Sequence, residues 1–411
     1  MPESLGRTHA RSRMFASLHY ANYRLLWMGN LVSQSGDWMD QLAFNWLVLS
    51  LTGSPFFLGL VNFCRAVPIL LFTLVGGAAA DRFERRRLMM VTQSFAMLLA
   101  FLLAVLVTSG LINIWLILAI AALRGTMMSF NLPARQSLIS DLVPEDDLPN
   151  AIALNSTTMN FTRIIGPSIA GLLIVAVGVA GCFYLNALSF LAVLWTLNAM
   201  TFPVKPRKAA TRKVRGSLTD GFRYIASDRT LLLLVGIATV PMFFGQPYMT
   251  MLAAFAYDVL SVGPAGLGIM TSAVGVGAVI GGLTLASLGK SAPRGLIMLG
   301  GMATFGFLLT LFCYSSWMPL SVLLLMGAGA MNICYNASNN TLLQMRVPNE
   351  YRGRVLSTMY LNRSLVPLGT SLAGTLSVLV GVRAAVASMA GVVLVIGVLG
   401  MLMVPSLRKL S

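Results

Sequence analysis

Long apolar runs constrain this chain more than any other feature of its sequence. Runs of about 20 or more mostly apolar residues follow one another along nearly all of its 411 residues. An α-helix needs about 20 such residues to cross a bilayer, whereas a membrane β-barrel uses short segments of alternating polarity. The sequence therefore predicts an all-α integral membrane protein with twelve transmembrane helices. The runs are 25–51, 55–80, 88–109, 112–138, 150–177, 180–202, 230–256, 264–288, 294–313, 317–342, 356–380 and 384–404.

The charged residues indicate how the chain is oriented. The net charge of +16 would suit a nucleic-acid partner, but the positions of the basic residues argue against one. With the N-terminus in the cytoplasm, 23 of the 29 Lys and Arg lie in cytoplasmic segments and one lies in an outer loop. This asymmetry follows the positive-inside rule. We expect a multi-pass protein of a bacterial inner membrane, with both termini cytoplasmic and no nucleic-acid partner.

A polar, basic stretch separates the apolar runs into two sets of six. Residues 203–229 carry six Lys or Arg before their first acidic residue, so this stretch is predicted to be a cytoplasmic linker next to the lipid surface. The predicted organisation is a cytoplasmic arm at 1–24, a six-helix bundle at 25–202, the linker at 203–229, a second six-helix bundle at 230–404 and a cytoplasmic tail at 405–411.

The two sets of runs share a pattern. Four features recur in the same order at offsets of 200 to 205 residues, which favours two six-helix repeats with a binding site between them near the membrane midplane. The matching features are Gly76-Gly77 with Gly281-Gly282, Asn131 with Asn336, Val143-Pro144 with Val347-Pro348, and Arg163 and Pro167 with Arg363 and Pro367.

The loop after the second run has the sequence GGAAADRFERRR. This motif resembles the signature of the major facilitator superfamily, and the resemblance extends over essentially the whole chain. The resemblance implies that this loop latches a cytoplasmic gate, with the aspartate near the N-terminus of the eleventh helix, where the helix dipole stabilises an acid. The gate residues would be Gly77, Asp81, Arg82, Arg85 and Arg86.

Two further stretches resemble parts of the same superfamily. The sequence RIIGPSIAG in the fifth run, with Arg163, Gly166, Pro167 and Gly171, resembles the Gly-Pro motif of its antiporter branch. Simple helix packing is the alternative for this motif. Arg124 stands where the family often has a buried arginine. The sequence of runs four and five is similar to that of the subgroup of siderophore exporters and macrolide-type efflux pumps. This similarity implies export.

Four charged residues are predicted to share one layer near mid-membrane. Asp37 and Asp40 are the only acids inside a membrane-crossing run, and a carboxylate there is costly unless it is paired, hydrated or protonated. From the outer helix ends, a rise of 1.5 Å per residue places Asp40, Arg65 and Arg124 at depths of about 16, 15 and 18 Å.

These four residues allow a functional and a structural interpretation. Burial disfavours a charged carboxyl and a nearby arginine favours it, so an acid here can exchange protons as its surroundings change. We expect Asp37 to carry the proton, Arg65 to be the partner of Asp40, and Arg124 to be a further charge partner. The alternative is a structural ion-pair cluster that holds the helices together. Arg135, near the inner end of its run, is expected to reach the interface.

Polar and aromatic residues at a similar depth are candidates for a substrate cavity, with packing as the alternative for each. Pro241 and Pro247 in the seventh run are expected to bend a gating helix. The cavity candidates are Gln34, Trp38, Gln41, Asn62, Gln246, Tyr248, Asn332, Tyr335 and Asn336.

The sequence favours a transporter over the other classes considered. The two histidines, His9 and His19, both lie in the N-terminal arm, and no grouping of nucleophiles or acids predicts an enzyme or a metal site. We expect a monomer without a cofactor that exports a small amphipathic molecule by proton antiport and alternating access. An uncoupled facilitator, an uptake symporter and a lysolipid flippase of the same fold are the alternatives.

Overall fold

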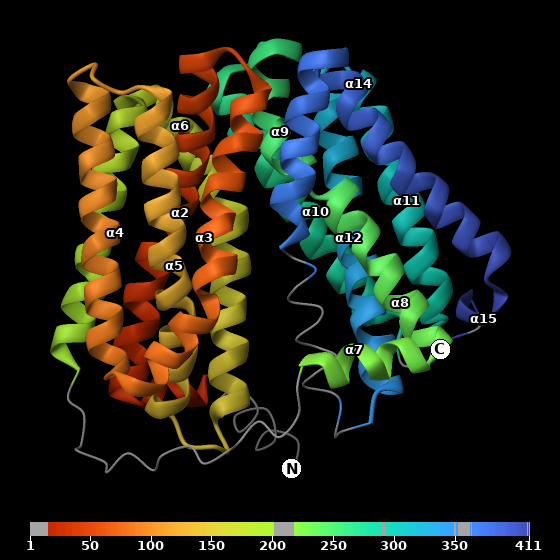
Figure 1. The fold of residues 1–411 in the computed structure, drawn as a ribbon, viewed down its shortest axis with the longest axis horizontal. Coiled ribbons are helices and arrows are strands. Elements are labelled where there is room, and N and C mark those ends of the chain that lie inside the picture. Colours follow the sequence, from red (N-terminus) through yellow and green to blue (C-terminus); the bar gives the residue numbers. More distant parts are fainter. Residues whose placement is uncertain are drawn as a thin grey trace, which may run out of the picture. The chain divides into compact units, whose positions relative to one another are not determined.

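A computed structural model describes residues 15–200, 218–289, 292–348 and 364–408, with 351, 362 and 410 besides, and every element in this part of the chain is helical. Figure 1 shows the helices in sequence colours. The first five long elements, with the short turn that precedes them, are η1 (Ala16–His19), α2 (Ala21–Thr52), α3 (Pro55–Arg82), α4 (Arg85–Thr108), α5 (Ile114–Leu142) and α6 (Leu148–Ala199). The later elements are α7 (Leu218–Ser227), α8 (Arg229–Val240), η2 (Pro241–Gly245), α9 (Tyr248–Ala254), η3 (Phe255–Val259), α10 (Gly263–Ser287), α11 (Arg294–Tyr314), α12 (Met318–Arg346), α14 (Leu365–Met403) and α15 (Pro405–Arg408).

Nine helical stretches within the described ranges are long and apolar enough to cross a membrane. Helix α2 has the length, at 32 residues, but it is not among these nine. Large apolar side chains such as Leu74 of α3 and Leu283 of α10 are exposed, at 78% and 68%. An apolar surface of this kind is expected when the solvent around it is lipid.

Helices α6 and α14 each contain a break at a glycine. Gly178 has φ 74° and Gly381 has φ 83°, a left-handed conformation that glycine adopts without the steric cost of a Cβ. The breaks fall between the runs 150–177 and 180–202 and between the runs 356–380 and 384–404. Each long helix therefore consists of two segments joined without a loop.

The chain divides into two compact units. Unit 1 comprises residues 1–51 and 64–205, and unit 2 comprises residues 52–63 and 206–411. Within unit 1, the helix ends next to η1 share a core that includes Tyr23, Met89 and Leu138. The turn η1 is attached beside this core, because the Ser17 hydroxyl donates to the Asp147 carbonyl at 3.1 Å and the Tyr20 hydroxyl donates to the Asp147 carboxylate at 2.7 Å.

Within unit 2, the segment from α8 to η3 departs from regular α-helical geometry. Pro241 begins a π turn, in which the Gln246 N–H donates to the Pro241 carbonyl at 2.7 Å. A proline removes one N–H from the helix and leaves nearby carbonyls to find other partners. The Tyr335 hydroxyl on α12 donates to one of them, the Ala238 carbonyl, at 3.1 Å. The irregularity lies where the two prolines of this run predict a bend.

In both units, the first glycine of the Gly-Gly pair lies against another helix and the second does not. A Cβ at Gly76 would collide with the Ser129 carbonyl of α5, and a Cβ at Gly281 would collide with the Ala330 carbonyl of α12. A Cβ at Gly77 or Gly282 would meet nothing within 4 Å. The first glycine of each pair therefore allows two helix backbones to touch, α3 with α5 and α10 with α12.

Candidate functional site

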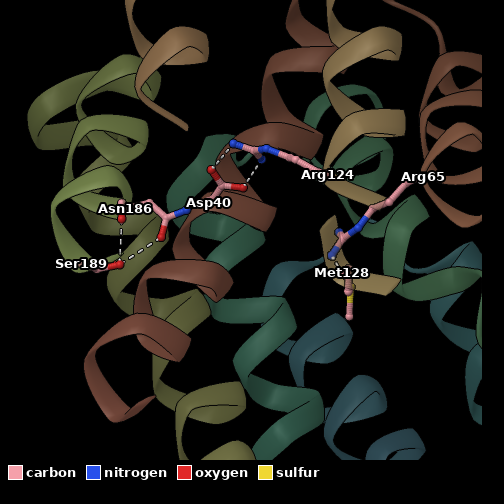
Figure 2. A network of polar contacts seen from close by, with 6 residues as sticks. All are labelled: Asp40, Arg65, Arg124, Met128, Asn186 and Ser189. Carbon is pink, nitrogen blue, oxygen red and sulfur yellow. Dashed lines mark hydrogen bonds and ion pairs between the residues drawn. The ribbon is translucent and has the colours of Figure 1, made fainter. Parts of the chain in front are cut away.

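The centre of the candidate site is an ion pair between α2 and α5. Two bonds join the Arg124 guanidinium to the Asp40 carboxylate, with Nη1 to Oδ2 at 2.5 Å and Nη2 to Oδ1 at 3.0 Å (Figure 2). The two side chains are only 16% and 10% exposed, and the Phe44 ring lies 5.4 Å from the guanidinium carbon. Parallel bonds of this kind are the strongest carboxylate–arginine geometry and satisfy both charges.

The structure corrects the expected partner of Asp40. Arg65 was predicted to pair with this carboxylate, but Arg124 occupies both of its oxygens. The Arg65 guanidinium instead donates from Nη2 to the Met128 sulfur at 3.6 Å, as Figure 2 shows. The reason is the direction in which Asp40 points: its face of α2 is turned toward α5. The depth estimate could not distinguish two arginines that lie at nearly the same level.

A close crossing of α3 and α5 positions the two arginines. A Cβ at Gly125, the residue after Arg124, would collide with the Arg65 carbonyl, so only glycine fits there. One turn further along α5, the Ser129 hydroxyl donates to the Pro68 carbonyl of α3 at 3.2 Å. The backbone contact therefore sets the relative position of Arg65 and Arg124.

Asp37 differs from Asp40 in its surroundings. Its side chain is exposed, whereas that of Asp40 is buried. The charged groups that act on it are Asp40, Arg135, Arg65 and Arg124. Among the described residues, it has no basic group within ion-pair distance. The two acids therefore have different environments, as their different predicted roles require.

Arg135 is a site residue that reasoning from the sequence missed. The sequence predicts only that it reaches the membrane interface, yet it is half-buried, and its charge is one of three arginine charges that act on Asp37. One feature of the sequence, its spacing from Arg124, pointed to Arg135. Arg135 follows Arg124 by eleven residues, which is three helical turns and returns to the same face of α5.

A second polar group that reasoning from the sequence missed is the pair Asn186 and Ser189 on α6. Asn186 is buried, and its side-chain carbonyl accepts a hydrogen bond from the Ser189 hydroxyl at 3.1 Å (Figure 2). A Cβ at Gly36, one turn before Asp40, would collide with both side chains. An amide inside an otherwise apolar run was the available signal in the sequence.

The predicted cavity residues on α2 and α3 have mixed positions. Gln41 is exposed on the same side of α2 as Asp37, and Gln34 is buried. Trp38 packs against Gly166 of α6, where a Cβ would lie 2.7 Å from the Trp38 Cβ. The Asn62 amide donates to the Leu58 carbonyl of its own helix at 2.9 Å. Gln41 is therefore the candidate most open to a ligand.

The predicted cavity residues of unit 2 also separate into two groups. Tyr248 and Tyr335 are buried in the packed interior, where Tyr248 makes an edge-to-face contact with Phe305 at 6.0 Å. Gln246 is half-buried. Two further half-buried residues pair with each other, because the Asn336 amide donates to the Asn332 side-chain oxygen at 3.1 Å. The amides remain candidates for ligand contact.

The predicted gate residues make contacts inside unit 1. Arg85 forms an ion pair with Asp141 at the end of α5 and donates to the Ser137 carbonyl at 3.2 Å, and Arg86 donates to the Asn198 carbonyl at 2.9 Å. The side chains of Asp81 and Arg82 are exposed, and Gly77 lies in open space. The start of the eleventh predicted helix, expected near Asp81, lies outside the described residues.

The antiporter-like motif lies in the first segment of α6. Gly166, Pro167 and Gly171 are buried, and Arg163 is half-buried. Gly166 makes the contact with Trp38 described above. This contact supports helix packing as the role of Gly166. Arg363, the counterpart of Arg163 in the second repeat, lies outside the described residues.

Comparison with known proteins places this architecture in a family. A family model described as "Transmembrane secretion effector" matches residues 12–410. The staphyloferrin A transporter of Staphylococcus aureus is 30% identical over 345 residues, covering 82% of this chain and 85% of the relative. The multidrug efflux pump Tap of Mycolicibacterium fortuitum is 25% identical over 396 residues, covering 94% and 96%.

Solved structures show the same fold. A bacterial homologue of the human lysosomal transporter Spinster, in an inward-facing and occupied conformation, aligns with a TM-score of 0.76 at 15% identity and covers 95% of this chain and 99% of its own. A bacterial homologue of the iron transporter ferroportin aligns with a TM-score of 0.71 at 17% identity, covering 95% and 99%. The chain therefore belongs to the transmembrane secretion effector family of the major facilitator superfamily, whose relatives found here are membrane transporters and not enzymes.

Proposed function

We propose that this protein is a proton-coupled exporter of a small amphipathic molecule, either a drug-like compound or a siderophore. The observation that carries the proposal is the contrast between two acids one helical turn apart. Asp40 is held by a bidentate bond to Arg124, whereas Asp37 is exposed beside three arginines. A proton carrier must be reachable from water and must change its charge, which suits Asp37 and not Asp40.

The proposed cycle is alternating access between two six-helix repeats. Twelve spanning segments follow if α2 crosses the membrane and if α6 and α14 each count as two segments at Gly178 and Gly381. The proposed setting is a bacterial inner membrane with both termini in the cytoplasm, and the proposed functional unit is a monomer driven by the proton gradient alone. Names of relatives that refer to multidrug and macrolide efflux support the direction of transport.

The experiment that tests this function begins with a screen. Accumulation of catecholate siderophores, macrolides and lipophilic cations is measured in efflux-deficient cells to find a substrate. Transport of that substrate is then measured in proteoliposomes with an imposed pH gradient. We expect gradient-driven transport by the wild type and by Asp37→Glu, and none by Asp37→Asn, which should still bind the substrate.

Each alternative has its own result in this assay. Transport that does not respond to the gradient identifies a facilitator or a flippase. Substrate movement in the same direction as protons identifies a symporter. Wild-type export by Asp37→Asn would remove this residue from the coupling step whichever direction transport takes.

A further inference from the structure

The Asp40–Arg124 pair sets the register of α2 against α5. Successive helices from α2 to α5 are joined by loops of only two to five residues, at 53–54, 83–84 and 109–113. Short loops make neighbouring helices antiparallel. Since three loops separate them, α2 and α5 run in opposite directions. Residues before Asp40 on α2 and residues after Arg124 on α5 therefore lie toward the same end of unit 1.

This register brings Asp37 and Arg135 toward each other. Asp37 precedes Asp40 by three residues, which is a shift of about 4.5 Å along α2. Arg135 follows Arg124 by eleven residues, which is a shift of about 16 Å on the same face of α5. The level of Asp37 therefore lies between the two arginines. A long arginine side chain extending from Arg135 spans most of the remaining distance.

The other two arginines near Asp37 already have partners. Arg124 uses two N–H groups on Asp40, and Arg65 donates to the Met128 sulfur. Among the described residues, Asp37 is the one opposite charge that acts on Arg135, while Arg65 also experiences the charges of Arg124 and Asp40. The charges acting on Asp37 come from its own helix (Asp40), from α3 (Arg65) and from α5 (Arg124 and Arg135), and α6, which packs on Trp38 through Gly166, carries Arg163 one turn before that contact.

We propose that Arg135 is the counter-ion of the deprotonated Asp37 side chain and leaves it when Asp37 takes up a proton. This role rests on the proposed proton coupling. Helix α5 then carries one fixed ion pair, Arg124 with Asp40, and one switching pair, Arg135 with Asp37. An arginine without a counter-charge is costly within the bilayer, so protonation of Asp37 drives the Arg135 guanidinium toward the inner interface.

The test measures protonation of Asp37 without measuring transport. Dicyclohexylcarbodiimide modifies a protonated carboxyl inside a membrane protein, and mass spectrometry of the peptide containing Asp37 gives the labelled fraction at each pH. The full-length protein is reconstituted in nanodiscs. For Arg135→Gln we expect the pH of half-labelling to rise by about one unit or more, because removal of an attractive charge makes the carboxylate less stable. Arg135→Lys keeps the charge, so its midpoint should stay near that of the wild type.

Arg65→Gln is the matched control, because it removes one arginine from the same layer. A wild-type midpoint in Arg135→Gln together with a shifted midpoint in Arg65→Gln would overturn the proposal and identify Arg65 as the counter-ion. Unchanged midpoints in both variants would overturn it as well. If Arg135→Gln does not fold, Asp37→Asn should restore folding in the double variant, and failure to do so counts against the pair. Wild-type export by Asp37→Asn contradicts the proposed function separately, whatever the labelling shows.

Discussion

At the scale of single residues, the site separates two aspartates by the direction in which each points. A step of three residues turns the side chain by about 60° around the helix axis. Asp40 thereby faces α5 and is neutralised by Arg124, while Asp37 is turned toward an exposed side of α2. Met128, which stands on α5 one turn after Arg124, gives Arg65 a thioether partner in place of a carboxylate.

The ion pair gives a prediction for stability. Replacing Arg124 by Gln leaves the buried Asp40 carboxylate without its counter-charge, which costs about 3–5 kcal/mol in comparable buried pairs. Arg65→Gln should cost much less, because its described partner is an uncharged sulfur. Thermal unfolding of the detergent-solubilised variants measures the difference. The double variant Asp40→Leu/Arg124→Met should recover most of the lost stability, and a double variant no better than Arg124→Gln would argue against the pair.

At the scale of helices, glycines decide how closely partner helices approach. The crossing of α3 with α5 uses Gly76 and Gly125, and the crossing of α10 with α12 uses Gly281 and Gly329. Backbone contact of this kind is the usual way in which membrane helices gain dispersion energy, since lipid offers no hydrophobic driving force between them. In unit 1 the same contact holds the carbonyl of Arg65 against α5, so helix packing and the charged site depend on one another.

The paired glycines offer a prediction with built-in controls. Gly76→Ala and Gly281→Ala place a methyl group against a backbone carbonyl and should destabilise the fold by about 1–3 kcal/mol. Gly77→Ala and Gly282→Ala meet open space and should be close to neutral. Expression level and unfolding temperature measure the difference between the variants of the first glycine and those of the second. Equal effects within either pair would show that helix propensity, and not helix contact, determines the outcome.

The start of α8 gives a pH-dependent prediction. Asp228 caps this helix through the N–H groups of Thr230 and Leu231 and pairs with Arg346 at 3.1 Å. Burial acts to raise the pKa of Asp228, but the bonds from Arg346 and from the two N–H groups outweigh it and lower the pKa below 3.8. A lowered carboxyl pKa contributes stability that is present above the unfolded value and is lost as the pH falls through the folded value.

Variants of Asp228 separate the cap from the charge. Asp228→Asn can still cap the helix but carries no charge, so its stability should fall less steeply than that of the wild type below pH 3.8. Asp228→Ala loses the cap as well and should be less stable by about 1 kcal/mol at neutral pH. Unfolding followed by circular dichroism across the acid range provides both measurements. Parallel acid profiles for the wild type and Asp228→Asn would rule out a contribution from this carboxylate.

At the scale of the whole molecule, polar chemistry is divided between the two units. Unit 1 carries the embedded charges Asp37, Asp40, Arg65, Arg124 and Arg135, while unit 2 carries the half-buried amides of α12. The first glycine of each recurring pair, Gly76 in unit 1 and Gly281 in unit 2, packs two helices against each other.

Orientation in the membrane gives a prediction for the intact chain. In a variant without the native cysteines, Ser109→Cys and Ser316→Cys should react with an impermeant maleimide added to whole cells, because both side chains are exposed at the ends predicted to face outward. Glu145→Cys and Leu288→Cys are also exposed and should react only after the cells are opened. The reverse pattern would contradict the orientation inferred from the basic loops.

The membrane class, the superfamily and the limits of most helices follow from the sequence alone. These properties are local, since hydropathy, helical rise and loop charge act on each segment regardless of its neighbours. The three-dimensional packing was needed to show that Asp40 pairs with Arg124 and not Arg65, and that the Tyr335 hydroxyl bonds to the Ala238 carbonyl. These contacts depend on the rotation of each helix about its axis and on the neighbour that it meets. Counting residues along the chain gives the position of a side chain along the helix axis but not the direction in which it points.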